Sequence, residues 1–241
     1  VVTLLTLSEI FHGKKIKFID IGALYGYFSV LAHGLFGDVE VVAVEGNPKS
    51  CRYIENVKQI NKFNKFSIIN AFVQNRKIGK INFYVYGYRF LGKADFYKIF
   101  LKNCLKKILN YFNADYVISV PFKCQIETTT IKDLLSGHAE LFIVKIDTEG
   151  YQATFLPDSV EALIEKKAII LLEFDNLDVL EELQSSNAQI CQPFLEKGYK
   201  LFWINHRSPG ARLHNLEVID KSKETNSLGI LVPREFVDSI L

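Results

Sequence analysis

Methionine is absent from this chain of 241 residues, and cysteine occurs only four times, at Cys51, Cys104, Cys124 and Cys191. The cysteines lie far apart and form no Cys-x-x-Cys pair, which argues against a metal or redox site and favours reduced thiols in a cytoplasmic protein. No apolar run approaches the roughly 20 residues that a membrane-spanning helix needs. No signal peptide is visible, and because the chain begins at Val1 we interpret it as a fragment.

An excess of charge of either sign is also missing. The formal net charge is +2 at pH 7, so bulk electrostatics give no reason to expect a nucleic-acid partner. Hydrophobic residues make up 49% of the chain, which is enough for a substantial core. Since no linker or repeat interrupts the sequence, we expect a single domain over residues 1–241. Its oligomeric state is not indicated.

Short apolar runs alternate with helical stretches from Lys15 to about Asn205. This alternation is typical of βαβ units and predicts a mostly parallel sheet. The last two strands lack a long helix between them, so we expect them to pair antiparallel at a sheet edge. One long helix is expected from about Leu177 to Glu196. The expected strands are 16–21, 40–45, 67–73, 81–86, 116–120, 141–147, 168–174, 200–205 and 228–232.

The first predicted strand ends in an acid and runs into a glycine turn, Asp20-x-Gly22-x-x-x-Gly26. Gly22 allows a sharp turn, and Gly26 lets the following helix approach a ligand. Dinucleotide sites carry Gly-x-Gly-x-x-Gly here, because a pyrophosphate lies on the helix N-terminus. A carboxylate at Asp20 would repel phosphate but suits the ammonium and sulfonium of S-adenosylmethionine (SAM). An ordinary glycine turn is the alternative.

The second predicted strand also ends in an acid, Glu45. A ribose-binding acid is expected about 20 residues beyond the glycine turn, which is close to this position. A carboxylate accepts two hydrogen bonds at once, which matches the paired hydroxyls of a ribose. Asn47 and Pro48 suit the N-cap and the first position of a following helix. Glu45 as a helix-start acid is therefore the alternative.

Two later strands end in acids as well. Residues 145–150 read Lys-Ile-Asp-Thr-Glu-Gly, and residues 172–175 read Leu-Glu-Phe-Asp. In an open α/β sheet the carboxyl ends of the strands form the ligand crevice, so we expect Asp147 and Glu149 close to the acid of the first strand. Glu149 is alternatively a helix-capping acid. Together with Asp175 these two acids are enough ligands for a divalent metal, although we expect no metal.

Residues 88–120 interrupt the rhythm of strands and helices, and we expect a helical insertion there. Within them, 94–112 predicts a basic amphipathic helix with Lys98, Lys102 and Lys106 on one face. The lysines indicate either the solvated face of a helix packed on the core or a functional surface. A functional surface would be a lid over the substrate, or a patch for an acidic partner or a peripheral contact with a membrane.

The motifs of this chain and their order along the sequence resemble those of the FkbM-type SAM-dependent methyltransferases. The resemblance implies a Rossmann-like α/β sheet of the class I methyltransferases, with seven strands of which the last is antiparallel. The chain departs from the family pattern at Leu24, Gln152 and Asp175, where Asn, Glu and His are frequent. The matching segments are 18–23, 26–29, 44–48, 128–135, 145–150, 172–174 and 229–233, and the Lys-x-Asp-x-Glu-Gly block at 145–150 is the most specific.

The resemblance also implies O-methylation of a hydroxyl on a small molecule or glycan, with a sugar or polyketide-like acceptor. Asp147 is the expected general base, and Glu149 is the second candidate. Two alternatives stay open, a catalytically silent SAM-binding or interaction module and an NAD-dependent oxidoreductase, although the missing Gly-x-Gly-x-x-Gly argues against NAD. The expected cofactor-binding residues are Asp20, Gly22, Ala23, Gly26, Tyr27, Glu45, Gly46 and Asn47.

Overall fold

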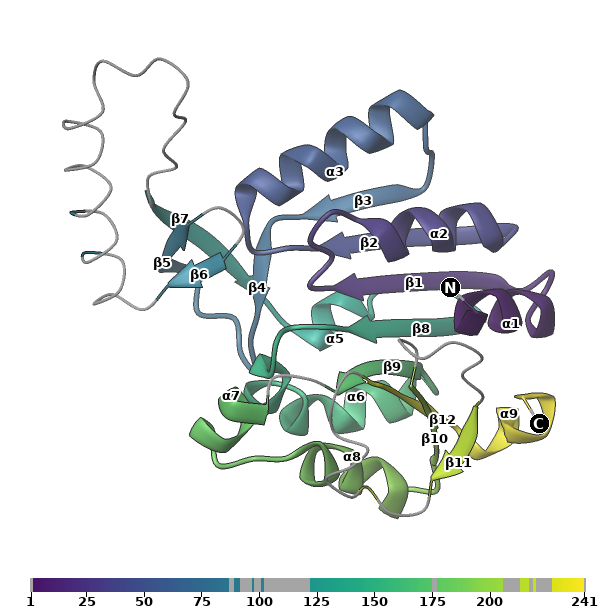
Figure 1. Ribbon diagram of the computed structural model, residues 1–241. Helices are drawn as coiled ribbons and strands as arrows, with labels where there is room; N and C mark the ends of the chain where they lie inside the picture. Colours follow the sequence, from purple (N-terminus) through teal and green to yellow (C-terminus); the bar gives the residue numbers. More distant parts are fainter. Residues whose placement is uncertain are drawn as a thin grey trace.

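The structure is a computed structural model that describes residues 2–86, 89–91, 97, 101, 122–174, 177–205, 213–216, 219 and 227–240. Within these residues a main sheet of eight strands has the order β11-β10-β12-β9-β8-β1-β2-β3 (Figure 1). Its strands are β1 (Lys15–Ile21), β2 (Asp38–Val44), β3 (Phe66–Ile69), β8 (Leu141–Ile146), β9 (Ile169–Phe174), β10 (Lys200–Ile204), β11 (His214–Leu216) and β12 (Ser227–Val232).

The strand directions confirm the predicted sheet. Strands β3, β2, β1, β8 and β9 run parallel to one another. Strand β12 pairs antiparallel with both β9 and β10, as expected for the last strand. The short β11, which the sequence did not indicate, pairs antiparallel with β10 and extends this edge. The main sheet therefore has the Rossmann-like arrangement with an antiparallel last strand that the resemblance implied, with one additional edge strand.

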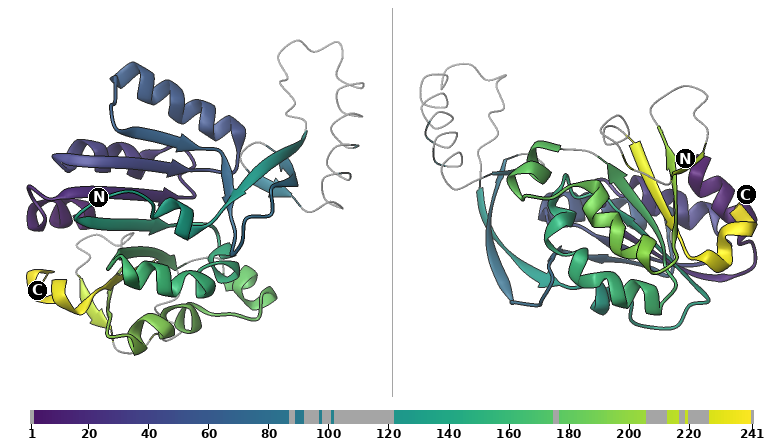
Figure 2. Two further views of the ribbon diagram at one scale, coloured as in Figure 1. Left: turned by 180° about the vertical axis from the view of Figure 1, so that it is seen from behind. Right: turned by 90° about the horizontal axis from the view of Figure 1, so that it is seen from below.

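Helices cover both faces of the main sheet (Figures 1 and 2). Because side chains alternate along a strand, Phe18, Val41 and Ile143 pack on one face, and Ile19 and Val144 pack on the other. The first face is covered by α1 (Val2–Ile10), α2 (Tyr27–Leu35), α3 (Pro48–Asn61) and α9 (Arg234–Ile240). The second face is covered by α5 (Ile131–Leu134), α6 (Val160–Glu165), α7 (Leu177–Glu182) and α8 (Asn187–Glu196).

A second, smaller sheet lies beside the carboxyl ends of the main strands (Figure 1). Its strand order is β4-β7-β5-β6. The predicted strand 67–73 is thus two strands, because the chain leaves the main sheet at Asn70 and enters the small sheet. The strands are β4 (Ala71–Val73), β5 (Lys80–Tyr86), β6 (Arg89–Leu91) and β7 (Phe122–Thr129).

The structure differs from the sequence-based prediction at one helix, and it does not describe most of the predicted insertion. The strand expected at 116–120 and most of the insertion at 88–120 lie outside the described residues, as does most of the basic helix at 94–112. The single helix expected over 177–196 is wrong, since it is two helices, α7 and α8. Ser186 ends the gap between them by accepting a hydrogen bond from the backbone N–H of Gln189 at 3.2 Å.

Membrane insertion through a helix finds no support in the described part of the chain. None of its helices combines the length and the apolar character needed to cross a bilayer.

Candidate active site

The glycine turn after β1 sits against the ends of both neighbouring strands. The backbone N–H groups of Gly22 and Ala23 donate to the carbonyl of Val44 at 3.0 and 3.2 Å. Gly22 and Gly26 have φ angles of +79° and +75°, which residues other than glycine rarely adopt. A Cβ on Gly26 would lie 3.1 Å from the side chain of Ile54, so this glycine lets α3 pack on the turn.

Glu45 joins the turn after β1 to the loop after β2. Its Oε2 accepts from the backbone N–H of Leu24 at 2.8 Å, and its Oε1 accepts from that of Asn47 at 2.7 Å. Only 6% of Glu45 is exposed, and this burial raises the pKa of its carboxyl. Each carboxylate oxygen keeps a further lone pair. Glu45 therefore shapes the site and still has acceptor capacity toward a ligand.

The loop after Glu45 is built around two asparagines. Asn47 is fully buried, and its Oδ1 accepts from the backbone N–H of Lys49 at 3.0 Å, which confirms it as the N-cap of α3. Its side chain therefore shapes the loop. Asn70 donates from Nδ2 to the carbonyls of Glu45 and Gly46 at 2.8 and 2.9 Å. Sequence reasoning missed Asn70, although a polar residue between two apolar strand runs was a usable signal.

Asp20 lies beneath the glycine turn and is only 1% exposed. Its Oδ2 accepts a hydrogen bond from Ser29 Oγ at 2.7 Å, while Oδ1 accepts none among the described residues. Burial raises the pKa of this carboxyl, and the nearby Lys145 and Ser29 oppose that effect. The expected contact between Asp20 and a SAM ammonium stays a prediction, and from this buried position it would run through water.

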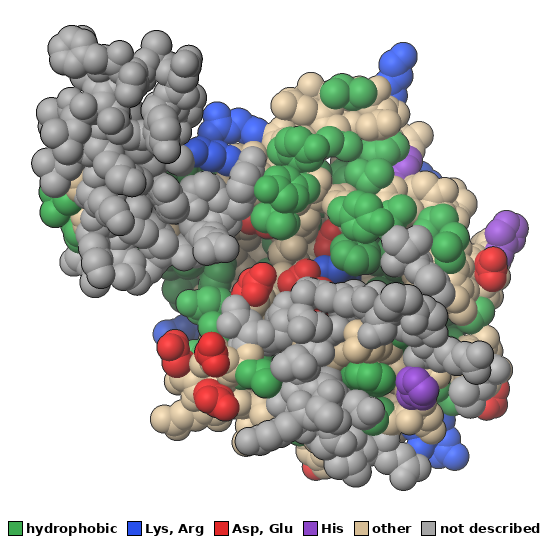
Figure 3. Space-filling model, viewed as in Figure 1, with side chains coloured by type: hydrophobic (Ala, Val, Ile, Leu, Met, Phe, Trp, Pro, Cys, Tyr) green, Lys and Arg blue, Asp and Glu red, His purple; other side chains and the backbone are tan. Residues whose placement is uncertain are grey.

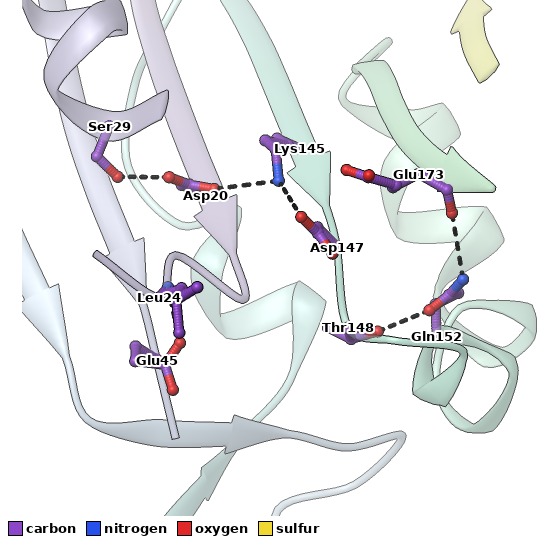
Figure 4. A network of polar contacts seen from close by, with 9 residues as sticks. All are labelled: Asp20, Leu24, Ser29, Glu45, Lys145, Asp147, Thr148, Gln152 and Glu173. Atoms are coloured by element: carbon purple, nitrogen blue, oxygen red, sulfur yellow. Dashed lines mark hydrogen bonds and ion pairs between the residues drawn. The ribbon is translucent and has the colours of Figure 1, made fainter. Parts of the chain in front are cut away.

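Lys145 stands between two of the predicted acids (Figure 4). Its Nζ lies 3.1 Å from Asp147 Oδ2 and 3.9 Å from Asp20 Oδ1, and its side chain is 3% exposed. Burial lowers the pKa of this ammonium, but the carboxylates around it outweigh burial and raise it overall. The sequence analysis assigned no role to Lys145. The usable signal was its spacing from Asp147, because residues two apart in an extended chain face the same side.

The loop after β8 brings Asp147 to the rim of the site. The side chain of Asp147 is 28% exposed, and its backbone N–H donates to the carbonyl of Ile21 at 3.0 Å. Glu149 has a φ of +55° and is exposed, and Gly150 occupies the N-cap of the 3-10 helix η1 (Tyr151–Thr154). Since Gly150 holds the N-cap position of η1, Glu149 is not the N-cap residue of this helix.

Gln152 holds this loop from inside. It is fully buried, and its Oε1 accepts from Thr148 Oγ1 at 2.8 Å and from the backbone N–H of Gly150 at 3.0 Å. Its Nε2 donates to the carbonyl of Glu173 at 3.5 Å (Figure 4). The carboxamide is thus engaged within the protein. The departure from Glu at this position therefore concerns loop structure and not a reacting group.

Exposed aromatic side chains flank the acids. Tyr25, Tyr27 and Tyr53 are 42%, 56% and 49% exposed, and the rings of Tyr25 and Tyr53 lie 5.5 Å apart. On the side of the small sheet, Tyr151 and Phe72 have ring centroids 6.1 Å apart. Figure 3 shows hydrophobic side chains gathered next to acidic ones on this face of the molecule. The rim can therefore contact both apolar and hydroxylated parts of a ligand.

The residues at these strand ends fit SAM. Helix α2 begins at Gly26 without a side-chain cap, which leaves N–H groups for a carboxylate. Glu45 has lone pairs for ribose hydroxyls, and the buried Asp20 Oδ1 suits a nearby cation. No group of three or more His, Cys, Asp or Glu side chains suited to a metal occurs among the described residues. Asp175, considered above as a metal ligand, lies outside them.

Known proteins resemble this chain to different degrees. No curated protein matches the chain. The crystal structure of methyltransferase FkbM from Methylobacillus flagellatus KT is 14% identical with a TM-score of 0.49, and the match covers 89% of this chain and 43% of that one. The precorrin-6y C5,15-methyltransferase from Geobacter metallireducens GS-15 is 13% identical with a TM-score of 0.46, covering 95% and 84%.

These structural similarities are too low to add to the assignment, which rests on a sequence match instead. The model of the methyltransferase FkbM domain matches residues 20–201. This span includes the glycine turn, Glu45, the 145–150 block and Glu173, and it covers most of the chain. The protein described here is a member of the FkbM methyltransferase family.

Proposed function

We propose that this chain binds SAM and transfers its methyl group to a hydroxyl oxygen of a small molecule or glycan. One observation carries the proposal. The glycine turn after β1 packs directly against the backbone of Asp147, so the cofactor-binding turn and the candidate base lie at adjacent strand ends. In open α/β sheets this edge is where ligands bind.

The chain's own residues would mainly position the reactants. SAM supplies a methyl carbon on a sulfonium, which is already reactive, so holding the acceptor oxygen in line is the larger task. A hydroxyl becomes a good nucleophile when a base removes its proton. Asp147 would accept that proton on Oδ1, because Lys145 holds its Oδ2. Glu149 is the second candidate for the base.

Calorimetry with the purified chain tests the cofactor. We expect SAM and its demethylated product S-adenosylhomocysteine to bind, and we expect NAD to give no heat. Heat from NAD alone would favour the oxidoreductase. No heat from either SAM or its product would refute the proposed function.

A labelled-methyl assay over a panel of sugars, glycans and hydroxylated polyketides tests the reaction. Asp147→Asn is expected to lower turnover by about 100-fold or more while SAM binding changes little. Glu149→Gln tests the second candidate for the base, and it should retain turnover if Asp147 is the base. The opposite ranking would move the base to Glu149. SAM binding without transfer to any acceptor would favour the silent module, and loss of turnover on chelation would favour a metal.

Three further expectations are carried as part of the proposal. They are a single domain over residues 1–241, a cytoplasmic location, and an acceptor other than nucleic acid. Limited proteolysis of the purified chain would test the first, since a stable fragment shorter than the chain would contradict it.

A further inference from the structure

We infer that Lys145 is a positioning residue for methyl transfer, whose ammonium fixes the carboxylate of Asp147 and links it to Asp20 beneath the glycine turn. This inference rests on the proposed function, in which Asp147 is the base. Lys145 itself does not touch the reacting atoms in this account; it acts through Asp147.

The geometry restrains the lysine on several sides. Its ammonium donates to Asp147 Oδ2 at 3.1 Å and faces Asp20 Oδ1 at 3.9 Å. The ring of Phe28 lies 4.6 Å from Nζ and adds a cation–π contact. The carboxylate of Glu173 points toward the Lys145 ammonium and helps to raise its pKa (Figure 4). A side chain that is 3% exposed and surrounded in this way has little freedom to leave Asp147.

The two acids that Lys145 contacts are placed differently. Asp20 is buried and already accepts from Ser29, so its pairing with Lys145 serves the fold. The side chain of Asp147 is 28% exposed at the rim. Among the described residues, Lys145 is the only one whose side chain donates a hydrogen bond to it. The same ammonium therefore stabilises a buried charge on one side and orients an accessible carboxylate on the other.

Orientation matters because proton removal and methyl transfer need one geometry. With Oδ2 held by Lys145, the other oxygen of Asp147 is presented toward an acceptor hydroxyl. A misplacement of about 1 Å can cost about 100-fold in rate. Loss of the ammonium would thus reduce turnover without removing the base, and it would leave ground-state binding of the acceptor nearly intact.

The test uses Lys145→Met, Lys145→Arg and a matched control, Lys17→Met. Lys17 is a buried lysine on the neighbouring strand β1, where it donates to the carbonyl of Ser136 at 2.7 Å and pairs with Glu40 at 3.2 Å, away from the site. We expect Lys145→Met to lower kcat by about 10- to 100-fold. The acceptor KM and the SAM Kd should change less than about threefold, Lys145→Arg should recover part of the loss, and Lys17→Met should keep full turnover.

Removal of Lys145 leaves Asp20 buried without its cationic neighbour, which destabilises the fold. If Lys145→Met alone does not fold, the double variant Asp20→Asn/Lys145→Met removes that unpaired charge, and its kcat is then compared with that of Asp20→Asn. A crystal structure of either variant gives a readout independent of turnover. The inference expects the Asp147 carboxylate in a changed or mixed rotamer, and an unchanged single rotamer would overturn it.

A double-mutant cycle with Asp147→Asn separates positioning from general damage. If Lys145 acts through Asp147, adding Lys145→Met to Asp147→Asn should lower kcat by less than about twofold. Effects that simply multiply would overturn the inference, as would an equal loss in Lys17→Met. Wild-type chain without turnover on any acceptor would refute the proposed function, whereas active wild type with an equally active Lys145→Met would refute the inference alone.

Discussion

A methyl group on Gly22 would overlap the backbone carbonyl oxygen of Asp147. The turn after β1 and the loop after β8 are therefore in direct backbone contact, and the absence of a side chain at Gly22 is what permits it. A neighbouring hydrogen bond, from the N–H of Asp147 to the carbonyl of Ile21 at 3.0 Å, stabilises this contact.

Gly22→Ala is expected to destabilise the protein by about 1–3 kcal/mol, because the φ of +79° and the overlap with Asp147 both oppose a side chain. We also expect weakened SAM binding. Chemical denaturation and calorimetry measure the two effects. Gly34→Ala, in α2 with open space around its Cα, is the control and should be neutral or slightly stabilising. Equal stability of the two variants would contradict the steric argument.

Glu45→Gln is expected to weaken SAM binding by about 10- to 100-fold, which corresponds to the loss of about one charge-assisted hydrogen bond. A carboxamide has one acceptor oxygen, so its NH₂ group would face the N–H of either Leu24 or Asn47. Calorimetry with SAM measures the change. Glu55→Gln, at a partly exposed position of α3 where the side chain pairs with Lys58, is the control and should bind SAM like the wild type. Unaltered affinity in Glu45→Gln would remove Glu45 from the cofactor site.

Gln152→Ala is expected to cost about 1–3 kcal/mol of stability, since it leaves buried groups of the 148–150 loop without their partner. Turnover should fall because Asp147 directly precedes this loop. Gln152→Glu keeps an acceptor for Thr148 and Gly150 but loses the donor to the carbonyl of Glu173, so it should be destabilised as well. Thermal unfolding and the methyl-transfer assay provide the measurements. Turnover that rises in Gln152→Glu would show instead that position 152 reacts with the acceptor.

Asp20 predicts a specific pH dependence of stability. Burial raises its folded-state pKa above the ordinary value of an aspartate, so its stabilising contribution is present below the unfolded pKa and is lost as the pH rises through the folded pKa. The unfolding free energy of Asp20→Asn minus that of the wild type should therefore increase between pH 4 and pH 7. Denaturant titrations at both pH values measure this difference.

Asp38 is a matched control with the opposite sign. It pairs with Lys65 at 2.7 Å, and this partner lowers its pKa. Its contribution is present above the unfolded pKa and is lost at acid pH, so the corresponding difference for Asp38→Asn should decrease from pH 4 to pH 7. A difference for Asp20→Asn that also decreases would mean that Lys145 outweighs burial at Asp20.

Local signals in the sequence were sufficient for much of the fold and for proposing a candidate site at the carboxyl ends of the strands. Continuous apolar runs predicted the buried strands β8 and β9, and Asn47 with Pro48 predicted the start of α3. Acids at the ends of strands and the family resemblance located the rim that carries Glu45 and Asp147. These features are readable because each depends on neighbouring residues, on the two-residue period of a strand or on the N-cap preference of a helix.

Contacts between distant segments had to be seen in three dimensions. The ammonium of Lys145 reaches Asp20 across 125 positions of sequence, and Gln152 reaches the end of β9. The sequence does not state such partners, because burial and strand register set them. The same cause explains why Asp20, read as a group facing the ligand, is covered, and why the chain turns at Asn70 into a second sheet. Residue types therefore indicated the chemistry of the candidate site, whereas packing determined which side chains are in contact.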